Sequence, residues 1–334
     1  MIAIKSESWH DDAKNVVTGE YDLALVAAGW DSRCLSILES ETFSSEHGIV
    51  IFYADKGKSG RSVSNETLLR DGMTRRCDLP PQIIEVDSSD ALSTWRRVRR
   101  EIVDIYRSAN RPLRAMIDIS TLPRYISMSL LGFGEKSGIF SEIAIYYQAA
   151  AEYSLGTSTG DLAFSAGELR PMPVIGLGTP GLARGASHLI VSVGFDGSKI
   201  SRLVDSLEPD RLSLLFAEPG TSRTNERLAR AQNSELINSY LVPESQIFSS
   251  AASSIQQTVS RLIEVTAEPF NRKDGRSEVH SILVCGTKAH AIAIAIYALS
   301  VPIKNVYYAQ PKGHREVETG VPLGSLLTEL VFPW

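Results

Sequence analysis

The chain carries one succession of short motifs twice, and this repetition constrains its fold more than any other feature. The stretch "VAAGWDSRCLSI" at residues 26–37 returns as "VSVGFDGSKISRLV" at residues 191–204, with a glycine, an aromatic residue and an aspartate aligned. Four further pairs follow in the same order at nearly constant spacing: 50–55 with 213–218, 65–70 with 225–230, 119–131 with 285–297, and 143–148 with 304–310. Ordered matches of this kind predict an internal duplication.

Within each half, apolar runs alternate with helix-period segments, as is typical of a parallel sheet covered by helices. In the first half the runs predict strands at 22–28, 49–54, 82–86, 114–118 and 142–147, and the third helix falls at 91–109. We therefore expect an α/β protein of two tandem Rossmann-like three-layer α/β/α units, packed about a pseudo-twofold axis. The expected division is 1–148 for the first unit, 149–187 for a linker or arm with room for a short hairpin, and 188–334 for the second unit with a C-terminal tail.

Composition excludes several classes of protein. The formal net charge of −5 argues against broad nucleic-acid binding. Cys34, Cys77 and Cys285 lie far apart, which predicts neither a disulfide framework nor a zinc ribbon and favours a reducing cytoplasm. The N-terminus lacks the pattern of a signal peptide, and the most apolar stretch, 291–301, is too short to span a bilayer. We expect a cytoplasmic protein that does not engage the membrane.

The matched motifs fall where parallel strands end, which is where open α/β sheets bind ligands. They supply glycines, hydroxyls, cations and helix N-termini, a combination that suits an anion. The candidate ligand-binding residues are Asp31, Ser32, Arg33, Lys56, Arg61 and Asn65 in the first half and Asp196, Lys199, Arg223, Asn225 and His290 in the second.

Each candidate has a structural alternative. The two aspartates and the two asparagines also suit helix N-termini, where these residues cap well. The basic loop residues also suit a solvated surface, and His290 is either a proton shuttle or a structural residue. Trp30 and Phe195 either stack on a base or fill the space between the halves. The six histidines form no H-x-x-x-H or H-E-x-x-H pattern, so we predict no metal site, and nothing in the sequence indicates a cofactor.

Two resemblances bear on function. The first motif is similar to the phosphate loop of ATP-pyrophosphatases, but it has Ala27-Ala28-Gly29 in place of Ser-Gly-Gly and it occurs twice. The segment "CGTKAHAIAIAIYAL" resembles the fourth-strand motif of CARF domains, the Rossmann-like sensors of CRISPR and related prokaryotic defence systems, and "DISTLPRYISMSLL" is similar. That family dimerises or occurs in tandem and binds cyclic oligoadenylate across the two-fold. The resemblance implies phosphate or ribose contacts for Ser120, Thr121, Arg124, Thr287 and Lys288.

The resulting hypothesis is a sensor of a nucleotide second messenger in antiviral defence. It would bind a nucleotide-type anionic ligand and act through a protein effector encoded nearby, and a homo-oligomer is one state open to it. One alternative is an enzyme in the same cleft, namely a metal-independent ring nuclease of the phosphodiesterase class or an ATP-using relative of the pyrophosphatases. Another is a non-catalytic scaffold of a defence complex.

Overall fold

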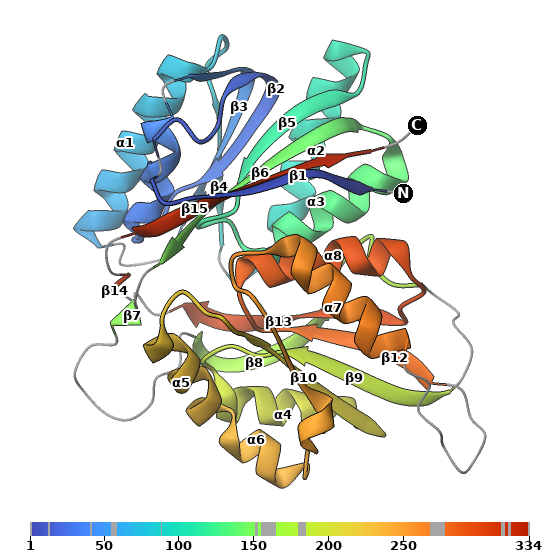
Figure 1. Ribbon diagram of the computed structural model, residues 1–334. Helices are drawn as coiled ribbons and strands as arrows, with labels where there is room; N and C mark the ends of the chain where they lie inside the picture. The colour runs from blue at the N-terminus through green and yellow to red at the C-terminus, as the bar shows by residue number, and fades with distance from the viewer. Residues whose placement is uncertain are drawn as a thin grey trace. The chain divides into compact units, whose positions relative to one another are not determined.

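The computed structural model describes residues 2–12, 14–40, 42–54, 59–87, 89–150, 153–154, 165–179, 185–267, 278–314, 318–319 and 322–332 (Figure 1). The chain divides into two compact units. One unit contains Met1–Ser154 together with Glu316–Trp334, and the other contains Leu155–Arg315.

The first unit is built on a seven-stranded sheet in the order β1-β15-β6-β5-β2-β3-β4. Its strands are β1 (Ala3–His10), β2 (Gly19–Ala27), β3 (Phe43–Tyr53), β4 (Gln82–Val86), β5 (Leu113–Asp118), β6 (Phe140–Ala150) and β15 (Pro322–Val331). Its helices are the 3₁₀ helix η1 (Ser32–Glu39), α1 (Gly60–Arg76), α2 (Ala91–Ala109) and α3 (Arg124–Ser137). The strands β2 to β6 run parallel, whereas β15 is antiparallel to both β6 and β1.

The second unit is built on a six-stranded sheet in the order β11-β10-β9-β12-β13-β8. Its strands are β8 (Ser165–Pro173), β9 (Ala186–Ser192), β10 (Arg211–Ala217), β11 (Ile247–Ser250), β12 (Glu278–Val284) and β13 (Asn305–His314). Its helices are α4 (Gly197–Leu207), α5 (Arg223–Gln232), α6 (Ser234–Ser239), the 3₁₀ helix η2 (Glu244–Gln246), α7 (Ile255–Ala267) and α8 (Lys288–Ser300). The strand β8 runs antiparallel to β13, and the other neighbours are parallel.

The two sheets share one strand order. From one edge, the first sheet runs β4-β3-β2-β5-β6-β15 and the second runs β11-β10-β9-β12-β13-β8. In both, five parallel strands are followed by one antiparallel strand, and the first sheet adds β1 beyond β15. The predicted fold class of two Rossmann-like α/β units is confirmed. The duplication itself stays an interpretation of the sequence matches, and the pseudo-twofold packing stays a prediction.

The antiparallel strands are exchanged between the halves of the chain. The strand β8 follows β6 in sequence but pairs with β13 of the second sheet, and β15 follows β13 but pairs with β6 of the first. The short strands β7 (Tyr153–Ser154) and β14 (Glu318–Thr319), which precede β8 and β15, pair with each other. The observed units therefore differ from the expected division. The stretch 149–187 is not only a linker, since it supplies β8 to the second sheet, and the C-terminal tail belongs to the first unit.

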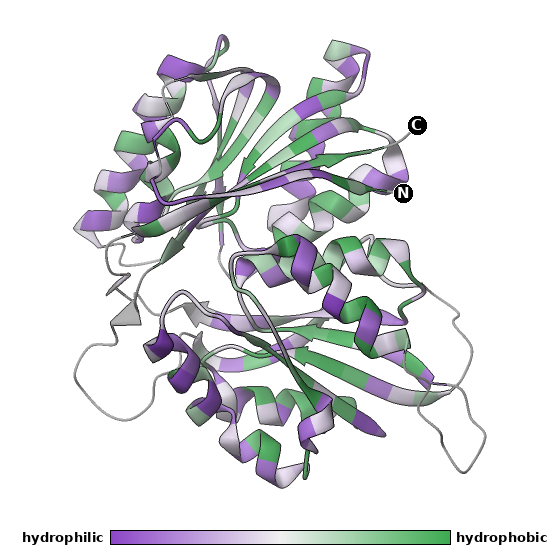
Figure 2. Ribbon diagram, viewed as in Figure 1, coloured by the Kyte–Doolittle hydropathy of each residue, from purple (hydrophilic) through white to green (hydrophobic). Residues whose placement is uncertain are grey.

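Burial of apolar strands and helices explains why these elements form. In α2, Asp90 caps the N-terminus and Trp95, Val98, Ile102 and Ile105 are buried on one face, as the helical period predicts. The helix α8 is buried on every side, with all residues from 289 to 298 shielded from solvent. Figure 2 shows apolar residues gathered on the strands of both sheets and polar residues along α5. None of the described helices is both long and apolar enough to cross a membrane.

Candidate functional site

The first strand-end motif is held together by an internal ion pair. Asp31 caps η1 by accepting a hydrogen bond from the Arg33 backbone N–H at 3.0 Å, and its carboxylate also accepts from Arg33 Nε at 2.9 Å. Arg33 Nη1 donates to the Gln148 carbonyl at 3.1 Å, and the side chains of Arg33 and Asp31 are only 7% and 11% exposed. The capping alternative for Asp31 is thus confirmed, and Arg33 is committed to partners within its own unit. Ser32 is exposed beside them.

Electrostatics agree with this internal role. Burial alone would raise the pKa of Asp31, but the charge of Arg33 and hydrogen bonds from Arg33 and Thr319 outweigh burial and lower the pKa. Thr319 Oγ1, on the short strand β14, donates to Asp31 Oδ1 at 3.0 Å. The aspartate therefore fastens the chain just before the exchanged strand β15.

The matching aspartate of the second unit does the same for the other exchanged strand. Asp196 makes no side-chain cap to α4, so the capping alternative was wrong for this residue. It accepts instead from Ser165 Oγ at 2.7 Å and from the Ser165 N–H at 3.1 Å, and Ser165 begins β8. Lys199 Nζ donates to the carbonyl of the same serine. In both units a strand-end aspartate and a nearby cation anchor polypeptide rather than facing an open site.

Two asparagines bind the carbonyl groups of the strand-end glycines. Asn65 Nδ2 donates to the Gly29 carbonyl at 2.8 Å, and Asn233 Nδ2 donates to the Gly194 carbonyl at 2.8 Å. The sequence match had paired Asn65 with Asn225, whose Nδ2 instead donates to Thr221 Oγ1 at 2.8 Å. Asn233 was missed because it lies at the far end of α5, although it occupies the contact that Asn65 makes in the first unit.

The "DIST" turn after β5 also uses its polar groups internally. Ser120 is fully buried, and its hydroxyl accepts from the Gln148 N–H at 2.8 Å. Thr121 Oγ1 donates to the Ala27 carbonyl, and Tyr53 donates its hydroxyl to the Thr121 carbonyl at 3.1 Å. These bonds tie the ends of β2, β3 and β5 together, so the two hydroxyls serve the scaffold of the sheet edge.

The equivalent turn after β12 depends on close backbone approach. A Cβ atom on Gly286 would lie 2.2 Å from Ser192 Oγ, and one on Gly194 would lie 2.4 Å from the Cys285 carbonyl oxygen. Thr287 caps α8 by accepting from the His290 N–H at 3.2 Å. His290 itself is fully buried, and burial lowers its pKa to about 4. This histidine is neutral and enclosed, which favours the structural alternative.

A shared feature remains at the carboxyl ends of the sheets, namely a cation in the first turn of four helices. Arg124 and Lys288 are the first residues of α3 and α8, which follow β5 and β12. Arg223 begins α5 after β10, and Arg61 is the second residue of α1 after β3. Arg61 and Arg223 are exposed. The structure thus places one such cation at each of two corresponding positions in both units. Lys56 lies outside the described residues.

Arg124 is distinctive among these cations. Its Nε is buried and has no hydrogen-bond partner among the described residues. The helix α3 that it begins has Pro123 at the N-cap, and this residue makes no side-chain cap to the helix. A buried guanidinium nitrogen without a hydrogen-bond partner among the described residues, at a helix N-terminus, forms a local environment that an anion would complement.

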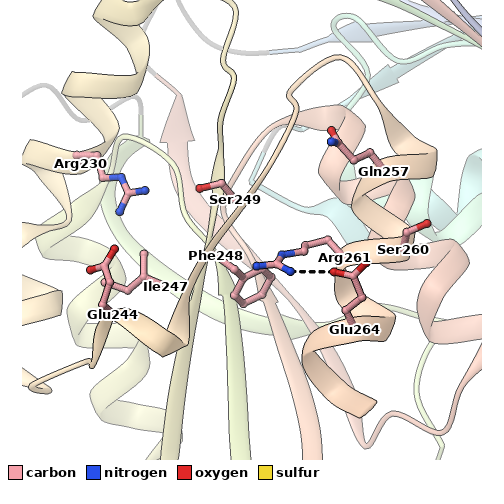
Figure 3. A pocket seen from close by; sticks show the side chains of 9 residues that line it. All are labelled: Arg230, Glu244, Ile247, Phe248, Ser249, Gln257, Ser260, Arg261 and Glu264. Atoms are coloured by element: carbon pink, nitrogen blue, oxygen red, sulfur yellow. Dashed lines mark hydrogen bonds and ion pairs between the residues drawn. The ribbon is translucent and has the colours of Figure 1, made fainter. Parts of the chain in front are cut away.

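A pocket of about 470 Å³ lies elsewhere, along the edge strand β11 (Figure 3). On one side Arg230 bonds Glu218 through its Nη2 at 2.6 Å, and on the other Arg261 bonds Glu264 at 2.8 Å. Figure 3 shows the Arg261 guanidinium beside the ring of Phe248, and the two centres are 5.9 Å apart. Because its arginines are paired with carboxylates, this pocket lacks the surplus positive charge that an anionic ligand would require.

Comparison with known proteins leaves the family open. No protein-family model matches the chain, and no curated protein matches its sequence. Among solved structures, the cytoplasmic domain of a prokaryotic cation chloride cotransporter aligns over 89% of this chain and 98% of its own, at 11% identity and a TM-score of 0.25. A functionally unknown protein from Pseudomonas aeruginosa aligns over 87% of this chain and 93% of its own, at 13% identity and a TM-score of 0.24. Scores this low carry no argument about function.

Proposed function

We propose that this chain binds a nucleotide-type anion at the carboxyl ends of its parallel strands and acts as a sensor that signals through a partner effector. The observation that carries the proposal is the cation in the first turn of α1, α3, α5 and α8, at corresponding places in both units. The class of ligand, a cyclic oligonucleotide second messenger of antiviral defence, follows from the resemblance to CARF domains.

The physical argument rests on the helix macrodipole. The N-terminus of a helix carries a partial positive charge, so a cationic side chain there is unfavourable in the free protein. A bound anion would neutralise both the side chain and the helix end. Acidic residues are absent from the first turns of α1, α3 and α8, and the Glu226 side chain of α5 accepts from the Gly220 N–H at 2.7 Å. The helices α1 and α3 flank the end of β2, and α5 and α8 flank the end of β9, which is where the strand order reverses.

Binding is favoured over catalysis by what the other polar groups do. Asp31 and Asp196 hold the exchanged segments, and His290 is enclosed. Within the described residues none of these three groups is free to take a proton from a ligand. A ring nuclease would have to rely on positioning of the ligand's own ribose hydroxyl.

The test begins with a panel of cyclic and linear oligonucleotides and inorganic phosphate, measured by thermal shift and by chromatography of the products. A sensor gives ligand-dependent stabilisation with the ligand recovered intact. Linear product formed in the presence of EDTA would support a ring nuclease in place of a sensor. Release of pyrophosphate from ATP with magnesium would support an ATP-using enzyme. Neither binding nor turnover across the panel would support the scaffold.

Variants locate the site. Arg124→Ala and Lys288→Ala should each weaken binding of the active ligand by about 1–3 kcal/mol, as expected for charge-assisted hydrogen bonds. The matched control is Arg96→Ala, which removes an exposed arginine from the outer face of α2 and should leave affinity unchanged. Equal affinity in all three variants would remove the assignment of the ligand to these helix N-termini.

A further inference from the structure

Two histidines and a glutamate meet at the amino ends of strands in the second unit. His188 of β9 and His280 of β12 are neighbours in register, and Glu278 precedes His280 by two positions, so the three side chains share one face of the sheet. The Nδ1 atoms of the histidines are 2.9 Å apart, and Glu278 Oε2 is 3.9 Å from His188 Nδ1. All three ligand atoms lie within 4.8 Å of one another.

Hydrogen bonds fix which nitrogen of His188 carries its proton. Gln246 Oε1 accepts from Arg211 Nε at 2.8 Å and from Ser213 Oγ at 2.6 Å. The Ser213 hydroxyl uses its hydrogen for Gln246. Ser213 Oγ therefore accepts the hydrogen bond from His188 Nε2 at 2.8 Å. His188 Nε2 therefore bears the hydrogen, and the lone pair on Nδ1 points toward His280. A histidine oriented through its second nitrogen in this way is the usual arrangement around a bound metal.

Glu278 supplies an independent observation. Its side chain is 9% exposed, and one carboxylate oxygen accepts from Arg211 Nη1 at 2.9 Å. The other oxygen, Oε1, is buried and has no hydrogen-bond partner among the described residues. A buried carboxylate oxygen normally has a partner, because desolvation without one is costly. A cation between Glu278 and the two histidines would provide it.

We propose that His188, His280 and Glu278 form a zinc-binding site that ties β9 to β12. Two imidazole nitrogens and one carboxylate are a ligand set that Zn²⁺ favours, with a fourth position left for water. Zinc–nitrogen bonds of about 2.0–2.1 Å suit nitrogen atoms roughly 3 Å apart. Burial and the charge of Arg211 lower the pKa of His188 to about 3 and lower that of His280, so both rings are neutral and able to coordinate. The positive charge of Arg211 opposes the metal and is itself paired with Glu278.

The site is independent of the anion site, because it lies at the opposite ends of the same strands. Its test uses zinc alone, with no nucleotide, so its failure would leave the proposed function standing. The full-length protein is stripped with EDTA, dialysed, and titrated with zinc by calorimetry. Cobalt is added in a parallel sample, because the visible absorption of Co²⁺ reports a tetrahedral site. One equivalent should bind, and the melting temperature should rise with zinc concentration.

The variants are His280→Ala, Glu278→Gln and the control His47→Ala, which removes a half-buried histidine of the first unit. His280→Ala should abolish zinc binding, and Glu278→Gln should weaken zinc binding at least tenfold. His47→Ala should bind zinc as the native chain does. Circular dichroism without zinc establishes that each variant is folded. If His280→Ala does not fold, Glu278→Gln, which preserves side-chain size, decides alone. Absence of stoichiometric binding to the native chain, or unchanged affinity in Glu278→Gln, would overturn the proposal.

Discussion

Replacing Arg124, a half-buried residue, by methionine should stabilise the ligand-free protein, the reverse of what most substitutions do. The guanidinium stands at the first position of α3, where its charge opposes the macrodipole, and its Nε is a buried donor without a hydrogen-bond partner among the described residues. Methionine keeps the unbranched stem and removes both unfavourable features. Relief of the charge is worth about 0.3–1 kcal/mol, and removal of the unsatisfied donor adds up to about 1 kcal/mol.

A gain of about 1 kcal/mol corresponds to a rise in Tm of roughly 2–4 °C for a unit of this size. The assay is urea and thermal unfolding of the native chain, Arg124→Met and Arg96→Met, in a buffer without phosphate. Arg96→Met should stay within about 0.5 kcal/mol of the native chain. Added inorganic phosphate should stabilise the native chain and so narrow the difference in unfolding free energy between it and Arg124→Met. If Arg124→Met instead destabilises the protein by about 1 kcal/mol or more, Arg124 is a structural residue and the anion argument fails.

Three further results are expected. In urea unfolding, Gly194→Ala should lower the unfolding free energy by more than about 2 kcal/mol, because the new Cβ meets a backbone oxygen at 2.4 Å. The control Gly29→Ala should be nearly neutral, because the nearest neighbour of its Cβ would be 3.9 Å away. Asn65→Ala and Asn233→Ala should each cost about 1–3 kcal/mol by chemical denaturation, since each frees one strand-end glycine carbonyl; a silent Asn233→Ala would contradict the assigned equivalence. Asp31→Asn breaks a buried pair and should cost about 3–5 kcal/mol at pH 7. Folding lowers the pKa of Asp31, so the ionised carboxylate contributes to stability above its unfolded pKa of about 4. That contribution is lost as the pH falls through the folded pKa. The difference in unfolding free energy between Asp31→Asn and the native chain should therefore shrink in acid.

The parallel core of each sheet could be predicted from the sequence because apolar runs of strand length and helical period identify buried elements directly. Every strand expected in the first half overlaps one of β2 to β6. The neighbours of the antiparallel strands could not be predicted in the same way. The strand β15 buries Leu326 and Leu330, a pattern that would suit the exposed edge of either sheet. Which edge it joins depends on the path of the chain, and the pattern of one strand does not record that path.

Short motifs identified the position of the candidate site better than the roles of its residues. "NETLLR" and "NERLAR" share four of six letters, but Asn65 lies six residues after the N-cap Ser59, while Asn225 lies three after the N-cap Ser222. The two side chains therefore leave their helices at different heights, and Asn233 makes the contact expected of Asn225. The histidine cluster was invisible for a related reason. His188 and Glu278 sit on different strands that meet only through the register of β9 and β12.

The exchange of β8 and β15 makes the two halves of the chain depend on each other. A break in the chain between β7 and β8 would yield a first fragment without β15, so both β1 and β6 would lose the strand that pairs with them. The second fragment would keep β15 with no sheet of its own to join. Neither fragment would be a complete domain, and the two could be restored only by complementing each other. Loss of either half of the chain would therefore remove a strand from the sheet of the other half.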